Sequence, residues 1–110
     1  MQDQATLGVA ISKNLSGQIK SMAGDLIGAL RDLSESIFVY REFNQLERLA
    51  EALVQRCELM LVSSSLARAR DDLEEARGIF EFTKDTANEA LTWKIDGEIS
   101  VATGQYPHVC

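Results

Sequence analysis

Apolar side chains recur every three or four residues from Ile11 to Tyr40, which is the spacing of one face of an α-helix. The positions on this face are Ile11, Leu15, Ile19, Met22, Leu26, Leu30, Leu33, Ile37 and Tyr40. One unbroken helix from residue 15 to residue 40 would extend about 39 Å at about 1.5 Å per residue, more than a domain of this size requires. The pattern therefore predicts a long first helix that is either kinked or part of an elongated bundle.

A second pattern lies on the opposite side of this predicted helix and consists of small residues. They are Gly17, Ser21, Gly24 and Gly28, which fall within a narrow arc at about 100° per residue. A glycine inside a helix costs about 0.5 to 1 kcal/mol relative to alanine, so three on one side suggest a compensating contact. The pattern favours a second helix that approaches closely there, and the alternative is a flexible face exposed to solvent.

A second helix is indicated from residue 44 onward. Asn44 and Glu47 have the spacing of an N-terminal capping pair, and an apolar face follows them. That face consists of Leu46, Leu49, Ala50, Leu53, Cys57 and Met60. From Cys57 the segment CELMLV is apolar on nearly every side, because Leu59 and Val62 point away from the face that holds Cys57. We expect this segment to be buried from more than one direction.

Apolar residues keep a seven-residue repeat beyond Ser63 to Ser65, where the helix boundary is left open. Large and small residues alternate at the positions Leu66, Ala69, Leu73, Ala76, Phe80, Thr83, Ala87 and Ala90. Such a repeat is typical of a helical hairpin or of a coiled-coil packing surface. Gly78 is expected to loosen this helix, and Thr86 with Glu89 has the spacing of a capping box for a new helix.

Residues 92–104 have two interpretations. Asp96-Gly97 between short alternating segments is a hairpin signal, whereas a helix that runs to Ile95 with Gly97 as its C-terminal cap is the alternative.

No internal repeat is evident. Together these patterns predict an all-α fold, namely an elongated antiparallel helical hairpin or a three- to four-helix bundle, with or without a short C-terminal β-hairpin. One helical domain is expected over residues 1–104, followed by a tail over residues 105–110.

The composition of the 110 residues restricts the cellular compartments and the classes of partner that we expect. Hydrophobic residues make up 45% of the chain and the only proline is Pro107, which suits long helices. The net charge of −6 disfavours a nucleic-acid backbone or an anionic membrane as the main partner. The N-terminus lacks the features of a secretory leader, and no apolar run reaches the roughly 18 residues of a membrane span. A cytoplasmic protein is expected.

Several catalytic and metal chemistries lack the residues that they need. The only histidine, His108, lies close to the C-terminus, so a nucleophilic relay would depend on the tail. Cys57, His108 and Cys110 do not supply four zinc ligands at a recognisable spacing, and Cys57 is most simply a small core residue. The favoured interpretation therefore contains no catalytic residue, no metal and no cofactor.

One enzymatic hypothesis rests on an acidic cluster made of Asp71, Asp72, Glu74 and Glu75. With Glu47 and Glu51 on a neighbouring helix, such carboxylates can hold Mg²⁺ against a nucleotide phosphate. The arrangement loosely resembles the all-α nucleotide pyrophosphatases, although the paired Glu-x-x-Glu pattern of that family is absent. The alternative, which we favour, is a solvated helix face with ion pairs at four-residue spacing, namely Arg68–Asp72, Arg70–Glu74 and Arg77–Glu81.

Arginines provide a second charged feature. Arg41 and Arg48 share one side of the second predicted helix, and Arg56 follows further along. An arginine binds a carboxylate or a phosphate through paired hydrogen bonds, so these three residues are candidates for a charged interaction surface. One alternative is that they hold a small anionic ligand between subunits, and another is that the charges serve solubility only.

The favoured function is a non-enzymatic protein-interaction or regulatory module, such as an adaptor, a chaperone or an inhibitor, including a phage-type inhibitor of a bacterial defence system. One chain offers too few helices to cover two seams on the first helix and the CELMLV segment, so a homodimer or higher oligomer is expected. The residues expected in the oligomer contact are Gly17, Ser21, Gly24, Gly28, Leu59 and Val62. We also expect an unidentified protein partner, and neither nucleic acid nor a membrane. The alternatives are a Mg²⁺-dependent nucleotide pyrophosphatase and a sponge for a small anionic ligand such as a nucleotide.

Overall fold

The computed structural model describes residues 4–63 and 65–103, and these residues form five α-helices and no strands. The helices are α1 (Gln4–Met22), α2 (Leu26–Glu42), α3 (Leu46–Val62), α4 (Leu66–Thr83) and α5 (Thr86–Thr103). The all-α prediction is confirmed, although there are five helices instead of the three or four expected. The difference comes from a break in the first predicted helix and from the helical conformation of residues 92–103.

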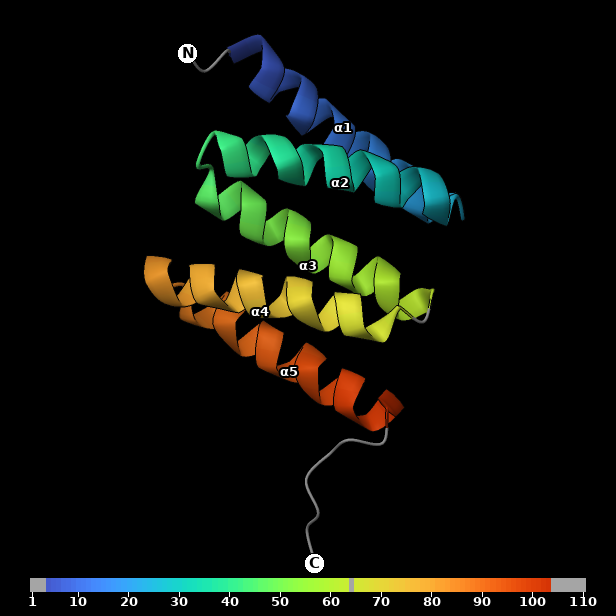
Figure 1. The fold of residues 1–110 in the computed structure, drawn as a ribbon, viewed down its shortest axis with the longest axis vertical. Coiled ribbons are helices and arrows are strands. Elements are labelled where there is room, and N and C mark those ends of the chain that lie inside the picture. The colour runs from blue at the N-terminus through green and yellow to red at the C-terminus, as the bar shows by residue number, and fades with distance from the viewer. Residues whose placement is uncertain (1–3, 64, 104–110) are drawn as a thin grey trace, which may run out of the picture.

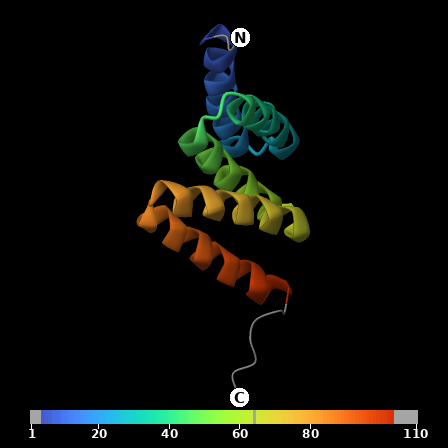
Figure 2. The same ribbon diagram turned by 60° about the vertical axis from the view of Figure 1, so that its left-hand side comes forward.

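The helices form an elongated stack in which each packs antiparallel against the next one in sequence (Figure 1). α1 and α5 therefore lie at opposite ends of the stack, and Figure 2 shows the same order from a second direction. The principal extents are 55 × 33 × 19 Å. The radius of gyration of 14.6 Å exceeds the roughly 13 Å typical of a globular domain of this length. The elongated form that the sequence allowed is therefore the one observed.

A tight turn at residues 23–25 divides the first predicted helix. Gly24 has a φ of 87°, in the left-handed region that glycine adopts without strain. The Asp25 carboxylate accepts a hydrogen bond of 3.0 Å from the Gly28 amide and so caps the first turn of α2. The predicted long first helix is therefore divided into two antiparallel helices and not merely kinked, and the elongated bundle is the alternative that holds.

α1 packs against the stack mainly with its small-residue side, and of its expected apolar face only Ile11 is partly buried against the core. Leu15, Ile19 and Met22, which their spacing places on the expected core face, are exposed. The buried residues of α1 are Ala10, Asn14 and Gly17, whereas α2 buries Leu33, Ile37 and Tyr40 as expected. Because the chain reverses at the turn, the apolar faces of α1 and α2 are not directed toward one core. α1 consequently presents apolar side chains outward.

The hairpins α1–α2 and α3–α4 are copies of one structural unit displaced by 40 residues. α2 begins at Leu26 and α4 at Leu66, and each helix is followed by a residue of positive φ, Asn44 or Lys84. Equivalent positions are buried in both helices: Ala29 and Ala69, Asp32 and Asp72, Leu33 and Leu73, Ser36 and Ala76, Tyr40 and Phe80. The expectation of no internal repeat is therefore wrong. Stacked helical hairpins of this kind are the architecture of α-solenoids, in which each unit contacts only its neighbours.

The capping pairs expected from the sequence are not formed. Asn44 lies in the turn with a φ of 55°, and Gln45 precedes α3 without a side-chain cap. At the start of α5 the capping side chain is Asp85, one residue before the expected Thr86, and its carboxylate accepts a hydrogen bond of 3.2 Å from the Asn88 amide. The local signals located both helix starts to within one or two residues and misidentified the capping contacts.

Residues 92–103 belong to α5, so the β-hairpin alternative is wrong for them. The helix also continues past Ile95 and Gly97, where the other alternative ended it. Thr92, Ile95 and Ile99 recur at intervals of three and four residues and are buried. Their shared face explains why the segment is helical, since a strand would have placed them on both sides of the chain. Residue 104 and the predicted tail over residues 105–110 lie outside the described residues.

Gly78, inside α4, and Gly24, in the turn before α2, allow a matched test of where the chain is helical and where it turns. We expect Gly78→Ala to raise the free energy of unfolding by about 0.5–1 kcal/mol, because Gly78 lies inside α4 with no atom within 4 Å of an added Cβ. Gly24→Ala should lower it by about 1 kcal/mol, because alanine is strained at a φ of 87°. Urea denaturation followed by circular dichroism measures both changes, and a stabilised Gly24→Ala variant would contradict the turn.

Candidate interaction surface

Four of the six residues expected in an oligomer contact line one groove between α1 and α3. Gly17 and Ser21 come from α1, and Leu59 and Val62 come from α3. The groove, here called the α1–α3 groove, has a volume of about 340 Å³ and is lined by Gly17, Gln18, Ser21, Met22, Leu33, Gln55, Glu58, Leu59 and Val62. The other two expected residues lie elsewhere, since Gly24 forms the turn before α2 and Gly28 sits over the Asp25 carboxylate.

Two residues of α2 form the common base on which α1 and α3 rest. A Cβ added to Gly17 would lie 3.3 Å from both the Ala29 carbonyl oxygen and Leu33 Cγ, so α1 approaches α2 closely. Leu59 of α3 packs against the same Ala29 and Leu33. The close approach expected from the small residues is confirmed at Gly17, and the neighbouring helix belongs to the same chain. The groove arises because α1 and α3 share this base without filling the space between them.

The rims of the groove are apolar and open to solvent. Met22 is 87% exposed and Val62 is 68% exposed. Burial of such side chains against a partner contributes about 25 cal/mol per Å² of apolar surface, before the entropic cost of association. The Gln55 Oε1 atom in the lining is itself buried and has no hydrogen-bond partner among the described residues.

A second apolar hollow lies between α1 and α2 and has a volume of about 440 Å³. Val9 and Phe38 are exposed at it, and the Lys13–Glu35 ion pair lies at its edge. Phe38 was missed at the sequence level, because it lies outside the apolar helix face and no periodic signal marks a single exposed aromatic residue. The α1–α3 groove is the stronger candidate, because it brings together four of the residues predicted for a contact.

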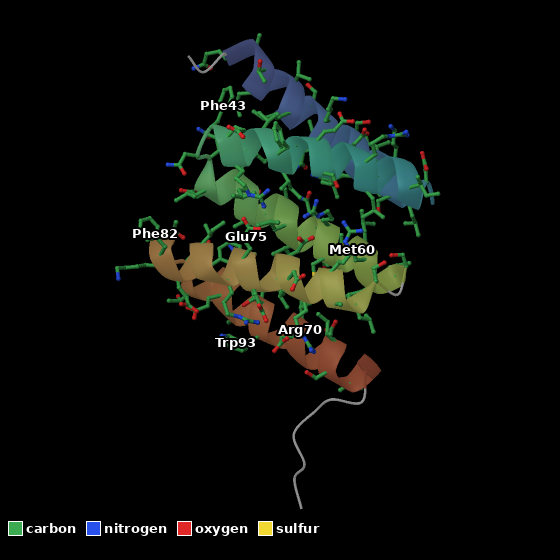
Figure 3. All side chains as sticks on the ribbon, viewed as in Figure 1. Phe43, Met60, Arg70, Glu75, Phe82 and Trp93 are labelled. Atoms are coloured by element: carbon green, nitrogen blue, oxygen red, sulfur yellow. The ribbon has the colours of Figure 1, made fainter. Side chains whose placement is uncertain are left out.

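Two of the three predicted surface arginines are paired with carboxylates of α4. Arg41 Nη2 donates to both carboxylate oxygens of Glu75, at 2.8 and 2.9 Å, and Figure 3 shows Glu75 on α4. Arg56 forms a bidentate pair with Asp72, at 2.7 and 2.8 Å, and also donates to Ser34 Oγ at 3.1 Å. The hydrogen bond to Asp72 raises the pKa of Arg56. These arginines join neighbouring helices within the chain.

The third arginine, Arg48, is exposed near Tyr40 and Glu51, where the described residues give it no ion pair. It therefore does not combine with Arg41 and Arg56 into one anion site. A small anionic ligand would have to displace carboxylates from those two arginines, which is costly for the mostly buried pair of Arg56.

The acidic cluster of α4 is divided between different sides of the helix. Asp71 and Glu74 are exposed, while Asp72 and Glu75 pair with arginines of α3 and α2. Over the described residues, no group of three or more histidine, cysteine, aspartate or glutamate side chains is placed to hold a metal ion. The four carboxylates therefore do not converge on one point.

The ion pairs within residues 4–63 and 65–103 join different helices. They are Lys13–Glu35, Lys20–Asp32, Arg41–Glu75, Arg56–Asp72 and Arg70–Asp96. Two interactions expected within α4 are replaced, because Asp72 pairs with Arg56 instead of Arg68, and Arg77 stacks 3.5 Å from the centre of the Trp93 ring. Figure 3 shows Arg70 and Trp93 along the boundary between α4 and α5. Charged side chains of α4 thus hold the two adjacent helices.

Asp32 is a buried carboxylate at the boundary between α1 and α2 that was not among the predicted site residues. Ser16 Oγ donates to it at 2.8 Å and Lys20 Nζ lies 2.9 Å away. These hydrogen bonds from Lys20 and Ser16 lower the pKa of Asp32. Asp32 and Asp72 are equivalent in the 40-residue repeat, so each hairpin holds a buried aspartate through a donor on its first helix. The shared pattern Ala-x-x-Asp-Leu, 40 residues apart, is the signal that could have identified both.

Cys57 is a free, fully buried thiol in α3. Burial raises its pKa to about 12, so the thiolate is scarce at neutral pH and the residue is chemically inert in the folded protein. Its predicted role as a small core residue is confirmed. His108 and Cys110, the other candidates for metal or thiol chemistry, lie outside the described residues.

None of the five described helices combines the length and the apolar character needed to cross a bilayer. Comparison of the chain with protein-family models, with curated proteins and with solved structures gives no match.

Proposed function

We propose that the protein is a non-enzymatic interaction module that acts as a helical homo-oligomer and binds a helix of a partner protein in the α1–α3 groove. The observation that carries this proposal is the apolar rim of Met22 and Val62, both largely exposed, above a base closed by Leu33 and Leu59. Placing an amphipathic helix in an apolar groove between two helices is a common mode of protein recognition.

The groove also indicates the chemistry of the partner helix. Its apolar face would cover Met22 and Val62, whose burial provides the main favourable contribution. Glu58 is exposed in the lining, and the chain is acidic overall, so basic residues beside the apolar face would be attracted. The partner is thus an amphipathic helix with basic flanks.

Site-specific photo-crosslinking in the cells that make the protein tests this proposal. A benzophenone amino acid replaces either Val62 or Val101, which is 67% exposed on α5 and thus a matched control for the 68% exposed Val62. We expect a discrete crosslinked partner protein from position 62 and not from position 101. The same product should be lost when Met22→Glu is added, because a carboxylate on the rim opposes burial of the apolar face.

Equal crosslinking from both positions would contradict the assignment of the groove, as would an absence of products from position 62. A product that contains only a second copy of this chain would also overturn the proposed binding of another protein there. Circular dichroism of Met22→Glu controls for folding, and an unchanged spectrum is expected because Met22 is 87% exposed.

A further inference from the structure

The outer face of α1, at one end of the stack, has the residues of a packed helix face although no other described helix covers it. It consists of Ala5, Gly8, Ser12, Leu15 and Ile19, all of which are exposed. Ile19 is 66% exposed, and a Cβ added to Gly8 would have no atom within 4 Å. None of the five side chains carries a charge.

The 40-residue repeat allows the residues of this face to be compared with those at equivalent positions in α3 and α5. Ile19, Leu59 and Ile99 occupy equivalent positions in α1, α3 and α5. Leu59 is buried against Ala29 and Leu33 of the preceding helix α2, and Ile99 is buried where α5 packs on α4. No described helix precedes α1, so Ile19 has no such cover. Ser12 shows the same difference, since its equivalents Ala52 and Thr92 are fully buried. The part of the outer face from Ser12 to Ile19 is therefore the exposed form of positions that α3 and α5 bury.

We propose that a second copy of this chain covers the outer face, with the two α1 helices antiparallel about a two-fold axis near Ser12. Small residues occupy the first half of the face and large residues occupy the second half. Antiparallel pairing about Ser12 brings Ile19 of one copy opposite Ala5 of the other, and Leu15 opposite Gly8. Each large side chain then meets a small one, which is the self-complementarity that an isologous contact requires.

Charge favours this surface for contact between two copies. The chain carries a net charge of −6, yet α1 contains no aspartate or glutamate. Its two lysines, Lys13 and Lys20, are paired with carboxylates of α2. The contact thus joins the least acidic helix of each molecule and keeps the acidic remainders apart, which limits repulsion between the copies. Antiparallel helices also place opposite ends of their dipoles side by side.

The size of the face sets the expected affinity. α1 is about 28 Å long, and one pair of such helices buries less than the roughly 1,600 Å² of a standard protein interface. The dimer is therefore expected to be reversible, with a dissociation constant on the order of micromolar. The proposed function includes self-association, and this dimer is the form that it would take. The inference therefore rests on that part of the proposed function. None of the five outer-face residues lines the α1–α3 groove, so the crosslinking at Val62 and the dimer test fail independently.

Sedimentation equilibrium from about 1 µM to about 1 mM, with reductant present, tests the dimer. The unmodified protein should shift from monomer to dimer across this range. Ile19→Glu should remain monomeric, because two carboxylates would be buried in the contact. Val101→Glu, a substitution at an equally exposed apolar residue on α5, should dimerise like the unmodified protein.

Mixed variants test the antiparallel register. Ala5→Lys and Ile19→Glu should each weaken the homodimer, whereas an equimolar mixture of the two should associate, because the introduced lysine of one copy then faces the introduced glutamate of the other. A disulfide provides a test that does not depend on destabilisation. In a Cys110→Ser background, Ser12→Cys should form a covalent dimer on mild oxidation, and Ser21→Cys should not.

A monomer at every concentration would overturn the proposal, as would association that survives Ile19→Glu. Association of the unmodified protein without recovery in the mixture, or equal crosslinking from Ser12→Cys and Ser21→Cys, would overturn the antiparallel arrangement. Concentration-dependent dimerisation that is lost in Ile19→Glu and recovered in the mixture would establish it.

Discussion

Asp72→Ala is expected to lower the free energy of unfolding by about 3 kcal/mol, because it leaves the charge of Arg56 without its partner at a mostly buried site. The Asp72 side chain is 8% exposed and that of Arg56 is 17% exposed, so water does not replace the carboxylate. The remaining hydrogen bond goes to the neutral hydroxyl Ser34 Oγ, which does not balance the charge of Arg56. Urea denaturation monitored by circular dichroism measures the loss, and the melting temperature should fall by more than about 10 °C.

Two control variants separate this charge effect from a general sensitivity of α4. Asp71→Ala removes the adjacent but exposed carboxylate and should change stability by less than about 0.5 kcal/mol. The double variant Arg56→Met, Asp72→Leu should recover most of the loss, because it leaves no charge buried. A loss below about 1 kcal/mol for Asp72→Ala would show instead that the pair behaves like a solvated surface ion pair.

Leu73→Ala should also lower the free energy of unfolding by about 3 kcal/mol, because it leaves a cavity among α4 and its neighbours. Leu73 has no exposed surface, and its equivalent in the first hairpin, Leu33, is almost completely buried. Leu33→Ala should therefore cause a similar loss. Urea denaturation measures both, with Ile27→Ala as a control at an exposed isoleucine, for which little or no loss is expected. A tolerated Leu73→Ala would mean that the core is loosely packed.

α3 and α4 could be predicted well from the sequence because each is covered on its apolar face by neighbours in the stack. Leu53, Cys57 and Leu73 are fully buried, as their spacing indicates. The packing of α1 could not be predicted from the sequence. Its apolar residues resemble a core face, whereas Ala10, Asn14 and Gly17 make the contact with α2. Periodicity identifies a helix face and does not say whether that face meets the same chain, another molecule or water.

The candidate groove was only partly accessible from the sequence, for a related reason. Gly17, Ser21, Leu59 and Val62 stood out by size or by apolar character, and they do meet in the groove. The unpaired Gln55 Oε1 and the pairing of Arg56 with Asp72 depend on how α3 is placed between α2 and α4. Distances between helices are set by tertiary packing, and the periodicity of apolar residues within a helix gives no measure of them.

The nearest-neighbour order of the helices has a consequence for how fast the chain folds. Each helix packs mainly against its neighbours in the sequence, across connections of two or three residues. Bringing such segments together closes only short loops, so little chain entropy is lost before the contacts form. Helical proteins with contacts this local in sequence fold in microseconds to milliseconds. The chain can therefore begin to fold at either hairpin and extend the ordered region helix by helix, even while its last residues are still being synthesised.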